Sequence, residues 1–343
     1  MLCDKVLDDF LSKELLAAQA IDKDYAELHT TIREYVAGGG KRIRPYLTVL
    51  AYQGYGGDDI TTATHVACAW ELLHAALLVH DDIIDRDVIR HGKPNITGMY
   101  QQIYSTLTDE SVDHYALSAA LLAGDLLITA SQNIILRSSL SADQKIQILQ
   151  YLNTAIFKVG GGELLDTETA LRSISQTNPR LIAQYKTSSY SFISPLQSGA
   201  FLAGADADQL EQIHFLGDKI GVAFQLIDDL LGVFGDEKQT GKSSDGDIRE
   251  RKHTLLLQET FTRASTSDRK KLTDYYSIST NLSNKDISYI RSLMISTGAK
   301  EAIAKEAAQL ASEAKEAIAQ LQMTDDAKNA MYDIVEVILK RQN

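Results

Sequence analysis

Residues 72–85 read LLHAALLVHDDIID, an apolar run that ends in three aspartates. A helix that is apolar on all sides is stable only when other helices surround it. At about 100° per residue, Asp81 and Asp85 lie about 40° apart, and Asp82 flanks them. Aspartate is a mediocre helix former and neighbouring carboxylates repel each other, so such a cluster is costly unless a cation binds there.

A second stretch repeats this pattern at residues 221–232, which read GVAFQLIDDLLG. Here Asp228 and Asp229 follow the apolar run. Either cluster alone fits a solvated acidic helix end about as well as a metal site. Magnesium, however, takes one or two carboxylates per ion and completes its shell with water and phosphate oxygens. Two such clusters facing each other therefore predict a magnesium site.

The remaining sequence also favours helices. Hydrophobic residues make up 44% of the 343-residue chain, which has only four prolines and no linker rich in proline, glycine or serine. These features predict an all-α fold, a large single-domain helical bundle over residues 1–343 with a central active-site cavity and almost no sheet. The expected helices are 5–20, 22–37, 43–55, 60–87, 112–137, 141–159, 179–203, 207–234, 252–263, 266–279, 284–297, 299–321 and 324–341.

Charge and targeting signals narrow the function. A net charge of -12 argues against nucleic acid as the partner, because no surplus of basic residues exists to replace its counterions. Cys3 and Cys68 lack metal-ligand spacing and are expected to be free thiols in a reducing cytosol. The first residues show no export pattern, and polar residues such as Asp125 interrupt the apolar run 115–136. We expect a buried core helix there, no transmembrane segment and a cytoplasmic protein.

Residues 38–45 read GGGKRIRP and form the basic motif of this acidic chain. Glycines allow the backbone to approach an anion closely, and three cations follow within four residues, so the motif indicates a diphosphate pocket. A helix C-cap with a basic end is the simpler alternative. Lys242 and Lys252 flank the acidic loop after the second cluster and could close over a metal-bound phosphate.

Together these motifs resemble the trans-isoprenyl diphosphate synthases of the polyprenyl synthetase family, among them the geranylgeranyl and polyprenyl diphosphate synthases. The matching segments are 39–45, 71–74 with 81–85, 186–187 and 224–229, in the family's order. The resemblance implies an isoprenoid-synthase helical bundle, usually a homodimer, with Mg²⁺ between the aspartate motifs. It also implies a prenyltransferase that condenses isopentenyl diphosphate with an allylic diphosphate through an allylic carbocation and releases diphosphate.

The resemblance assigns roles to individual residues. The magnesium ligands are Asp81, Asp85 and Asp228, with Asp82 and Asp229 beside them. The isopentenyl diphosphate ligands are Lys41, Arg44 and His74. The allylic diphosphate site comprises Arg90, His91, Lys186, Thr187, Gln225, Lys242 and Lys252. Within that site, the groups expected to act on the carbocation are Lys186, Thr187 and Gln225.

The sequence departs from the family pattern at three positions. His91 stands where a second arginine is usual, which would make that diphosphate contact weaker or pH-dependent. Gly232 replaces the third aspartate of the second motif. Arg251 replaces the common glycine before Lys252, which leaves the path of that loop open.

The helix before the first aspartate motif is expected to form the wall of an apolar tunnel for the growing prenyl chain. Ala76, five residues before Asp81, is small, so the family resemblance favours a geranylgeranyl or longer product over farnesyl. Leu77 and Leu73 lie about one and two turns below Asp81, at about 5.4 Å per turn, and are candidates to stop growth.

Other functions compete with this interpretation. Glu71-x-x-His74 and Glu211-x-x-His214 fit the paired motif of a di-iron carboxylate bundle, although that site leaves the aspartate clusters and the basic motif unused. A terpene cyclase shares the ionisation step but consumes one diphosphate, so it needs no second basic pocket. A non-enzymatic partner subunit would more often have lost one metal motif.

Overall fold

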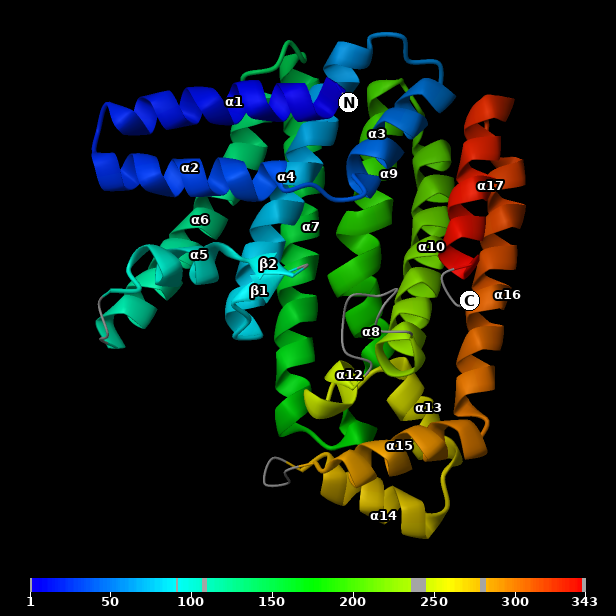
Figure 1. Ribbon diagram of the computed structural model, residues 1–343. Coiled ribbons are helices and arrows are strands. Elements are labelled where there is room, and N and C mark those ends of the chain that lie inside the picture. Colours follow the sequence, from blue (N-terminus) through cyan, green and yellow to red (C-terminus); the bar gives the residue numbers. More distant parts are fainter. Residues whose placement is uncertain (1, 91, 107–109, 236–244, 278–281, 341–343) are drawn as a thin grey trace. The chain divides into compact units, whose positions relative to one another are not determined.

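The structure is a computed structural model that describes residues 2–90, 92–106, 110–235, 245–277 and 282–340. Most of these residues lie in helices (Figure 1), which confirms the prediction of an all-α fold. Strands β1 (Ile89–Arg90) and β2 (Lys93–Pro94) pair as a small antiparallel hairpin. The chain forms two compact units, unit 1 (Met1–Leu152 and Ser198–Gly204) and unit 2 (Asn153–Gln197 and Ala205–Asn343). The single domain and the central cavity stay predictions.

Unit 1 is built around helix α4. Its helices are α1 (Leu2–Gln19), α2 (Lys23–Ala37), α3 (Ile43–Gly54), α4 (Ile60–Ile84), α5 (Ile96–Ile103), α6 (Glu110–Leu136) and the first part of α7 (Ala142–Glu168). Helices α1 and α2 lie side by side in Figure 1, and α4 packs against α1, α3 and α6. Trp70, Leu72 and Leu73 of α4 are fully buried. The continuous apolar run predicted such an inner helix, and the prediction is confirmed.

The ends of α4 follow from its sequence. The carboxylate of Asp59 caps the helix by accepting hydrogen bonds from the backbone N–H groups of Thr61 at 3.1 Å and Thr62 at 3.4 Å. No glycine or proline interrupts the next 25 residues, so the helix continues to Ile84, and Asp85 is its C-cap. The first aspartate cluster thus lies at a helix C-terminus, where the helix dipole also disfavours negative charge.

Helix α6 is less buried than predicted. It exposes the large apolar residues Tyr115, Leu117, Leu121, Leu122 and Leu136. In its most apolar window 44% of the residues are buried, compared with 72% in α4. Both helices are long and apolar enough to cross a membrane by length and composition only, a criterion that buried core helices also meet. The prediction of a buried core helix over 115–136 is therefore wrong for the exposed side of α6.

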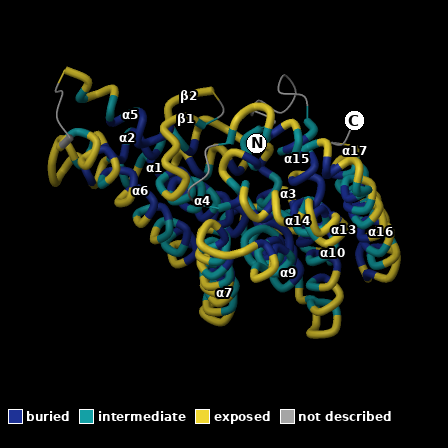
Figure 2. Tube along the Cα trace, turned by 90° about the horizontal axis from the view of Figure 1, so that it is seen from below, coloured by how far each residue is buried: buried dark blue, intermediate teal, exposed yellow. Residues whose placement is uncertain are grey.

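Unit 2 contains the remaining elements. These are η1 (Thr169–Leu171), η2 (Ile174–Gln176), α8 (Pro179–Ile182), η3 (Ala183–Ile193), the start of α9 (Ser194–Leu202), α10 (Ala207–Phe234), α12 (Gly246–Arg249), α13 (Leu255–Arg263), α14 (Thr266–Tyr275), α15 (Asn284–Ser296), α16 (Ala299–Gln320) and α17 (Asp325–Lys340). Helix α10 packs against η3 and α16, and α16 packs against α17. Most helices of both units have a buried and an exposed side (Figure 2).

Two glycines set the close approach of α10 to η3. A Cβ atom at Gly217 would collide with the backbone of Ile193, and one at Gly221 would collide with Ser188. Any larger residue at these positions would push the two helices apart. The second aspartate cluster, which lies two turns after Gly221 on α10, is thereby held next to η3.

The single helix expected over residues 179–203 is broken into three pieces. Residues Ala183–Ile193 form the π-helix η3, between α8 and α9. π-Helical geometry is rare and occurs often at functional sites, because the extra residue per turn re-aims side chains. Lys186 and Thr187 lie inside this segment. Helix α7 also continues to Glu168, well beyond the expected end at residue 159.

Candidate functional site

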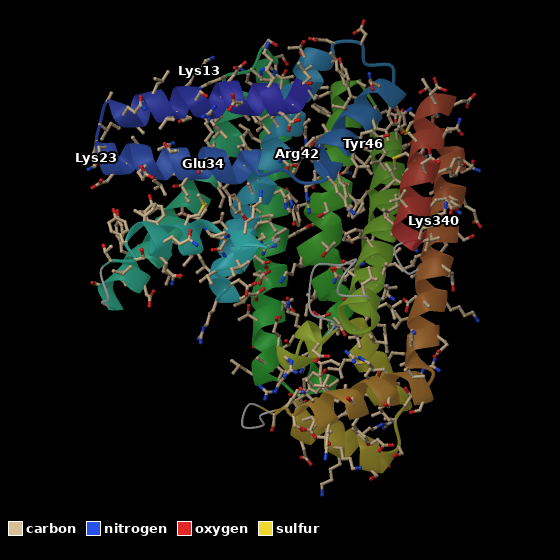
Figure 3. All side chains as sticks on the ribbon, in the orientation of Figure 1. Lys13, Lys23, Glu34, Arg42, Tyr46 and Lys340 are labelled. Carbon is tan, nitrogen blue, oxygen red and sulfur yellow. The ribbon has the colours of Figure 1, made fainter. Side chains whose placement is uncertain are left out.

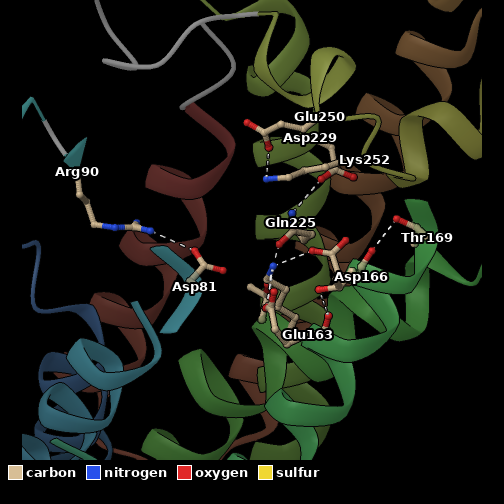
Figure 4. Close-up of polar contacts among 12 residues, drawn as sticks. Asp81, Arg90, Glu163, Asp166, Thr169, Gln225, Asp229, Glu250 and Lys252 are labelled. Carbon is tan, nitrogen blue, oxygen red and sulfur yellow. Dashed lines mark hydrogen bonds and ion pairs between the residues drawn. The ribbon is translucent and has the colours of Figure 1, made fainter. Parts of the chain in front are cut away.

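The first aspartate cluster, in unit 1, is paired with Arg90 of the hairpin. The Arg90 guanidinium donates from Nε to Oδ1 of Asp82 at 2.7 Å. It also donates from one Nη to Oδ2 of Asp81 at 3.1 Å (Figure 4). The Asp82 side chain is 3% exposed. Burial raises the pKa of Asp82 above its usual value, although Arg90 opposes this effect. Asp85, the C-cap of α4, is exposed.

The hairpin that carries Arg90 is fixed by Asn95. The Asn95 side chain donates from Nδ2 to the carbonyl of Asp87 at 2.7 Å and accepts from the N–H of Gly98 at 3.0 Å. Gly98 is required here because a Cβ atom would collide with the carbonyl of Val88. The short connection between α4 and α5 therefore presents Arg90 to the aspartates in one geometry.

The carboxylates of this cluster have the chemistry of magnesium ligands. Within the described part of the chain, Oδ2 of Asp82 is buried and has no hydrogen-bond partner. Its lone pairs are therefore available to coordinate a cation or to accept a hydrogen bond from a water that the cation binds. No group of three or more His, Cys, Asp or Glu side chains in that part lies close enough together to hold a metal ion by itself. Magnesium does not need such a group, because water and phosphate oxygens complete its coordination shell.

In the basic motif, Arg42 is the structural anchor. It adopts a left-handed backbone conformation, with φ of +47°, directly before α3. Arg42 is labelled in Figure 3. Its buried guanidinium donates to Oδ1 of Asp4 at 3.2 Å, to Glu71 and to the carbonyl of Val36 at 2.9 Å. The sequence motif therefore contains a buried residue that ties α1, α2 and α4 to the loop, directly after the exposed Lys41.

The residues predicted to hold isopentenyl diphosphate also belong to unit 1. Lys41 is exposed, whereas Arg44 and His74 are half-buried. Their joint action on one ligand stays a prediction. Of the proposed tunnel wall, Leu73 and Ala76 are fully buried and Leu77 is half-buried.

In unit 2, a chain of hydrogen bonds links η3 to the second aspartate cluster. The Thr187 hydroxyl donates to Oε1 of Gln225 at 2.7 Å, and Nε2 of Gln225 donates to Oδ1 of Asp229 at 2.9 Å. Oδ2 of Asp229 accepts from the N–H of Leu255 at 3.2 Å. Asp229 is buried, and burial raises its pKa well above the usual range, whereas Asp228 is exposed. The structure thus joins Thr187 and Gln225, which were predicted for the allylic diphosphate site, to Asp229, which was predicted beside the metal ligands.

Lys186 is held by two acidic residues that the sequence analysis did not assign to this site. Its ammonium lies 2.9 Å from Oε2 of Glu163 and 2.7 Å from Oδ2 of Asp166, both on α7 (Figure 4). Gly162 allows this approach, because a Cβ atom there would collide with the backbone N of Lys186. The signal in the sequence was the run GGELLD at residues 161–166, where glycines precede two acidic residues at a spacing of three.

Asp247 is a third residue that the sequence did not assign to this site. A Cβ atom at Gly232 would collide with the Asp247 carboxylate, so the glycine leaves the space that this carboxylate occupies. Asp247 also contributes to the raised pKa of Asp229. The Asp247 carboxylate of α12 therefore lies in the space that a side chain at position 232 would fill.

The loop before Lys252 keeps the conformation that glycine would favour. Arg251 has φ of +55°, in the left-handed region, and donates from Nε to the carbonyl of Tyr275 at 3.2 Å. The following Lys252 lies 2.8 Å from Oε2 of Glu250.

Two predicted ligands, His91 and Lys242, lie outside the described residues. That the two aspartate clusters face each other stays a prediction.

Comparisons with known proteins all point to one protein family. The sequence model of the family "Polyprenyl synthetase" matches residues 25–294. A short chain isoprenyl diphosphate synthase of Methanothermobacter thermautotrophicus is 29% identical over 90% of this chain and 88% of its own length. A geranylgeranyl diphosphate synthase of Sulfolobus acidocaldarius is 29% identical over 73% of this chain and 72% of its own length.

Solved structures agree with the sequence comparisons. The geranylgeranyl pyrophosphate synthase of Corynebacterium glutamicum, complexed with isoprenyl diphosphate and magnesium, superposes with a TM-score of 0.88 at 28% identity, over 99% of this chain and 98% of that one. The chain therefore belongs to the polyprenyl synthetase family and is an enzyme of its trans-prenyltransferase class.

Proposed function

We propose that this enzyme condenses isopentenyl diphosphate with an allylic diphosphate in a magnesium-dependent reaction, releasing diphosphate and a longer trans-prenyl diphosphate. The observation that carries the proposal is the hydrogen-bonded chain Thr187–Gln225–Asp229 beside Lys186, because it joins an oxygen-rich surface for a cation to an acidic metal position. The magnesium-bound relative from Corynebacterium glutamicum supports the choice of metal.

The acidic residues would hold magnesium through Asp81 and Asp85 in unit 1 and Asp228 in unit 2. When bound, magnesium neutralises the charge that builds up on the departing diphosphate. Asp82 and Asp229 are more buried than these ligands. They are hydrogen-bonded to Arg90 and Gln225, so they are proposed to position these side chains beside the metal ligands. Asp166 and Asp247 are proposed to add to the acidic groups of unit 2 around Asp228.

The basic residues would bind the two diphosphates. Lys186, Arg90, His91, Lys242 and Lys252 contact the allylic diphosphate, and Lys41, Arg44 and His74 contact isopentenyl diphosphate. In the structure, Arg90 pairs with Asp82 and Lys186 with Asp166. Binding of the substrate would therefore replace each carboxylate partner with a diphosphate oxygen. Thr187 and Gln225 present their oxygens to the allylic carbocation, which the double bond of isopentenyl diphosphate then attacks.

The product is proposed to be geranylgeranyl diphosphate or longer. Ala76 is small and fully buried on helix α4, and it is proposed to face the growing prenyl chain. Leu77 and Leu73 lie on the same helix and are proposed to end growth. The geranylgeranyl diphosphate synthases among the relatives support this range.

The exposed apolar face of α6 is proposed to be the interface of a homodimer in the cytoplasm. Tyr115, Leu117, Leu121 and Leu122 are large apolar residues exposed on α6, and exposed apolar surface marks interaction sites. The paired di-iron motif is not favoured, because Glu71 is already neutralised by Arg42.

The direct test is an assay of the full chain with isopentenyl diphosphate and allylic primers of increasing length. With magnesium we expect products of geranylgeranyl length or longer by mass spectrometry, and none after chelation. Release of diphosphate without chain extension would favour a terpene cyclase. Stoichiometric iron in the purified protein, together with no product, would favour the di-iron bundle.

A further inference from the structure

Unit 1 contains a pair of cysteines whose sulfur atoms are in contact. Sγ of Cys3 on α1 lies 3.1 Å from Sγ of Cys68 on α4, and the two residues are 65 positions apart in the sequence. They are the only cysteines of the chain. Cys3 is 7% exposed and Cys68 is fully buried. The Cys68 thiol also donates to the carbonyl of Cys3 at 3.5 Å.

Burial of one cysteine would carry no inference, because free cysteine packs in cores as a small hydrophobic residue. The contact between two thiols from different helices is a stronger observation. It depends on the packing of α1 against α4, and it places the only two oxidisable thiols of the chain next to each other. A disulfide bond is about 2.05 Å long, so the sulfurs need to approach by about 1 Å.

We propose that Cys3 and Cys68 form a reversible thiol–disulfide site that joins α1 to α4. The oxidant is a small-molecule disulfide of the glutathione type. Cys3 lies in the first turn of α1, where local opening exposes it, and its thiolate attacks one sulfur of the oxidant and releases one small thiol.

The Cys68 thiol then loses its proton to solvent, attacks the Cys3 sulfur and releases the second small thiol. In balance, the two protein thiols lose two electrons and two protons, and the small disulfide is reduced to two thiols. This order is set by Cys68 being the poorer first nucleophile, because its hydrogen bond to Cys3 and its burial raise its pKa.

The bond would act on the anchor of the basic motif. Asp4 follows Cys3, and Glu71 lies three residues after Cys68. Both carboxylates hold Arg42, the neighbour of Lys41. A covalent bond between α1 and α4 would therefore secure the same helix pair that carries the Arg42 contacts. It would also restrict the unfolded chain and so raise the Tm of unit 1.

The test uses the full chain, fully reduced and then equilibrated with oxidised glutathione. We expect the intact mass to fall by two hydrogen atoms, a non-reducing digest to yield one peptide pair linked through Cys3 and Cys68, and dithiothreitol to reverse both changes. The oxidised protein should unfold at a higher Tm than Cys3→Ser under the same conditions, whereas the reduced proteins should unfold together.

Cys3→Ser and Cys68→Ala are the matched controls, and neither should lose the two hydrogens. Cys3→Ser keeps the core residue Cys68, so it serves even where Cys68→Ala folds poorly. The proposal is overturned by two thiols that persist in folded protein after the urea-unfolded chain has oxidised, by glutathione adducts or intermolecular dimers alone, or by an unchanged Tm. These readouts do not use prenyltransferase activity, so they test this site independently of the proposed function.

Discussion

Arg90 holds Asp82 through a 2.7 Å hydrogen bond that crosses from the hairpin to the end of α4. Asp82 is the most buried carboxylate of the first cluster, and its second oxygen has no hydrogen-bond partner within the described residues. The guanidinium is therefore the positive charge that makes this carboxylate tolerable in the core. Because Arg90 is also a proposed diphosphate ligand, one side chain serves stability and binding together.

Replacing Arg90 with alanine should destabilise unit 1. Loss of one partner leaves a buried charge uncompensated, at a cost on the order of 3 kcal/mol. The measurement is urea unfolding followed by the fluorescence of Trp70, the single tryptophan, which is buried in α4. Activity should fall as well, because the allylic diphosphate loses a ligand.

Two variants separate the ion pair from a general effect on the hairpin. Lys93→Ala removes an exposed cation from β2 and should leave stability within about 0.5 kcal/mol. Adding Asp82→Asn to Arg90→Ala should recover most of the lost stability, because the buried charge is gone. If Arg90→Ala unfolds at the same urea concentration as Lys93→Ala, the pair does not stabilise the unit.

Local patterns predicted most of the helices. The apolar run before Asp81 and the Asp59 cap were both readable in sequence, because each acts within a few residues. The hairpin that presents Arg90 was missed, because its two-residue strands are too short for a period-2 pattern. The π-helix over Ala183–Ile193 was missed for another reason: its composition is that of an ordinary helix, and its geometry is set by packing against α10.

The site was predicted less completely than the fold. Thr187 and Gln225 were predicted for the allylic diphosphate site and Asp229 for the metal site, and the structure joins all three by hydrogen bonds. The carboxylates of Asp166 and Asp247 were missed, because their roles depend on contacts between elements far apart in sequence. Pattern shows which residues are unusual, but only packing shows which of them meet.

Stability of unit 2 should decline in mild acid through His253. This imidazole is buried, its Nδ1 lies 3.3 Å from Oγ1 of Thr177, and burial lowers its pKa. At pH values between the pKa of the unfolded state, about 6.5, and the lower pKa of the folded state, His253 is protonated in the unfolded chain and neutral in the folded chain. The contribution of neutral His253 to the free energy of unfolding is therefore fully present above about pH 6.5, and it is lost as the pH falls toward the pKa of the folded state.

His253→Gln should flatten this decline. The measurement is hydrogen exchange of peptides from α13 (Leu255–Arg263) at pH 8 and at pH 5.5, corrected for the intrinsic exchange rate. The exposed His114→Gln should retain the wild-type slope. An equal slope in His253→Gln and wild type would assign the pH dependence to other groups.

Ala76→Phe should shorten the product if Ala76 faces the prenyl chain. The residue is fully buried, so the larger ring also strains the core by about 1–3 kcal/mol. Product length is read by mass spectrometry on protein shown to be folded by Trp70 fluorescence. Ala75→Phe adds the same volume to the adjacent side of α4 and should keep the wild-type length. Unchanged length in Ala76→Phe, or equal shortening in both variants, would contradict the wall assignment.

Restoring the family's third aspartate, by Gly232→Asp, should impair this enzyme. The new side chain would enter the space of the Asp247 carboxylate and add a third negative charge near Asp229, which burial already makes hard to ionise. We expect kcat/KM to fall by about 10-fold or more, corresponding to about 1.4 kcal/mol, with a lower Tm in the absence of magnesium.

The double variant Gly232→Asp/Asp247→Ala decides between two reasons for that loss. If Asp247 supplies the carboxylate that position 232 lacks, Asp247→Ala alone should also lose activity, and the double variant should recover part of it, because one carboxylate again occupies the shared space. The recovered activity should depend on the magnesium concentration, because the double variant restores the acidic site and does not change the fold. Additive losses in the double variant would mean that the two positions act separately and that Gly232 serves only the packing of α10 against α12.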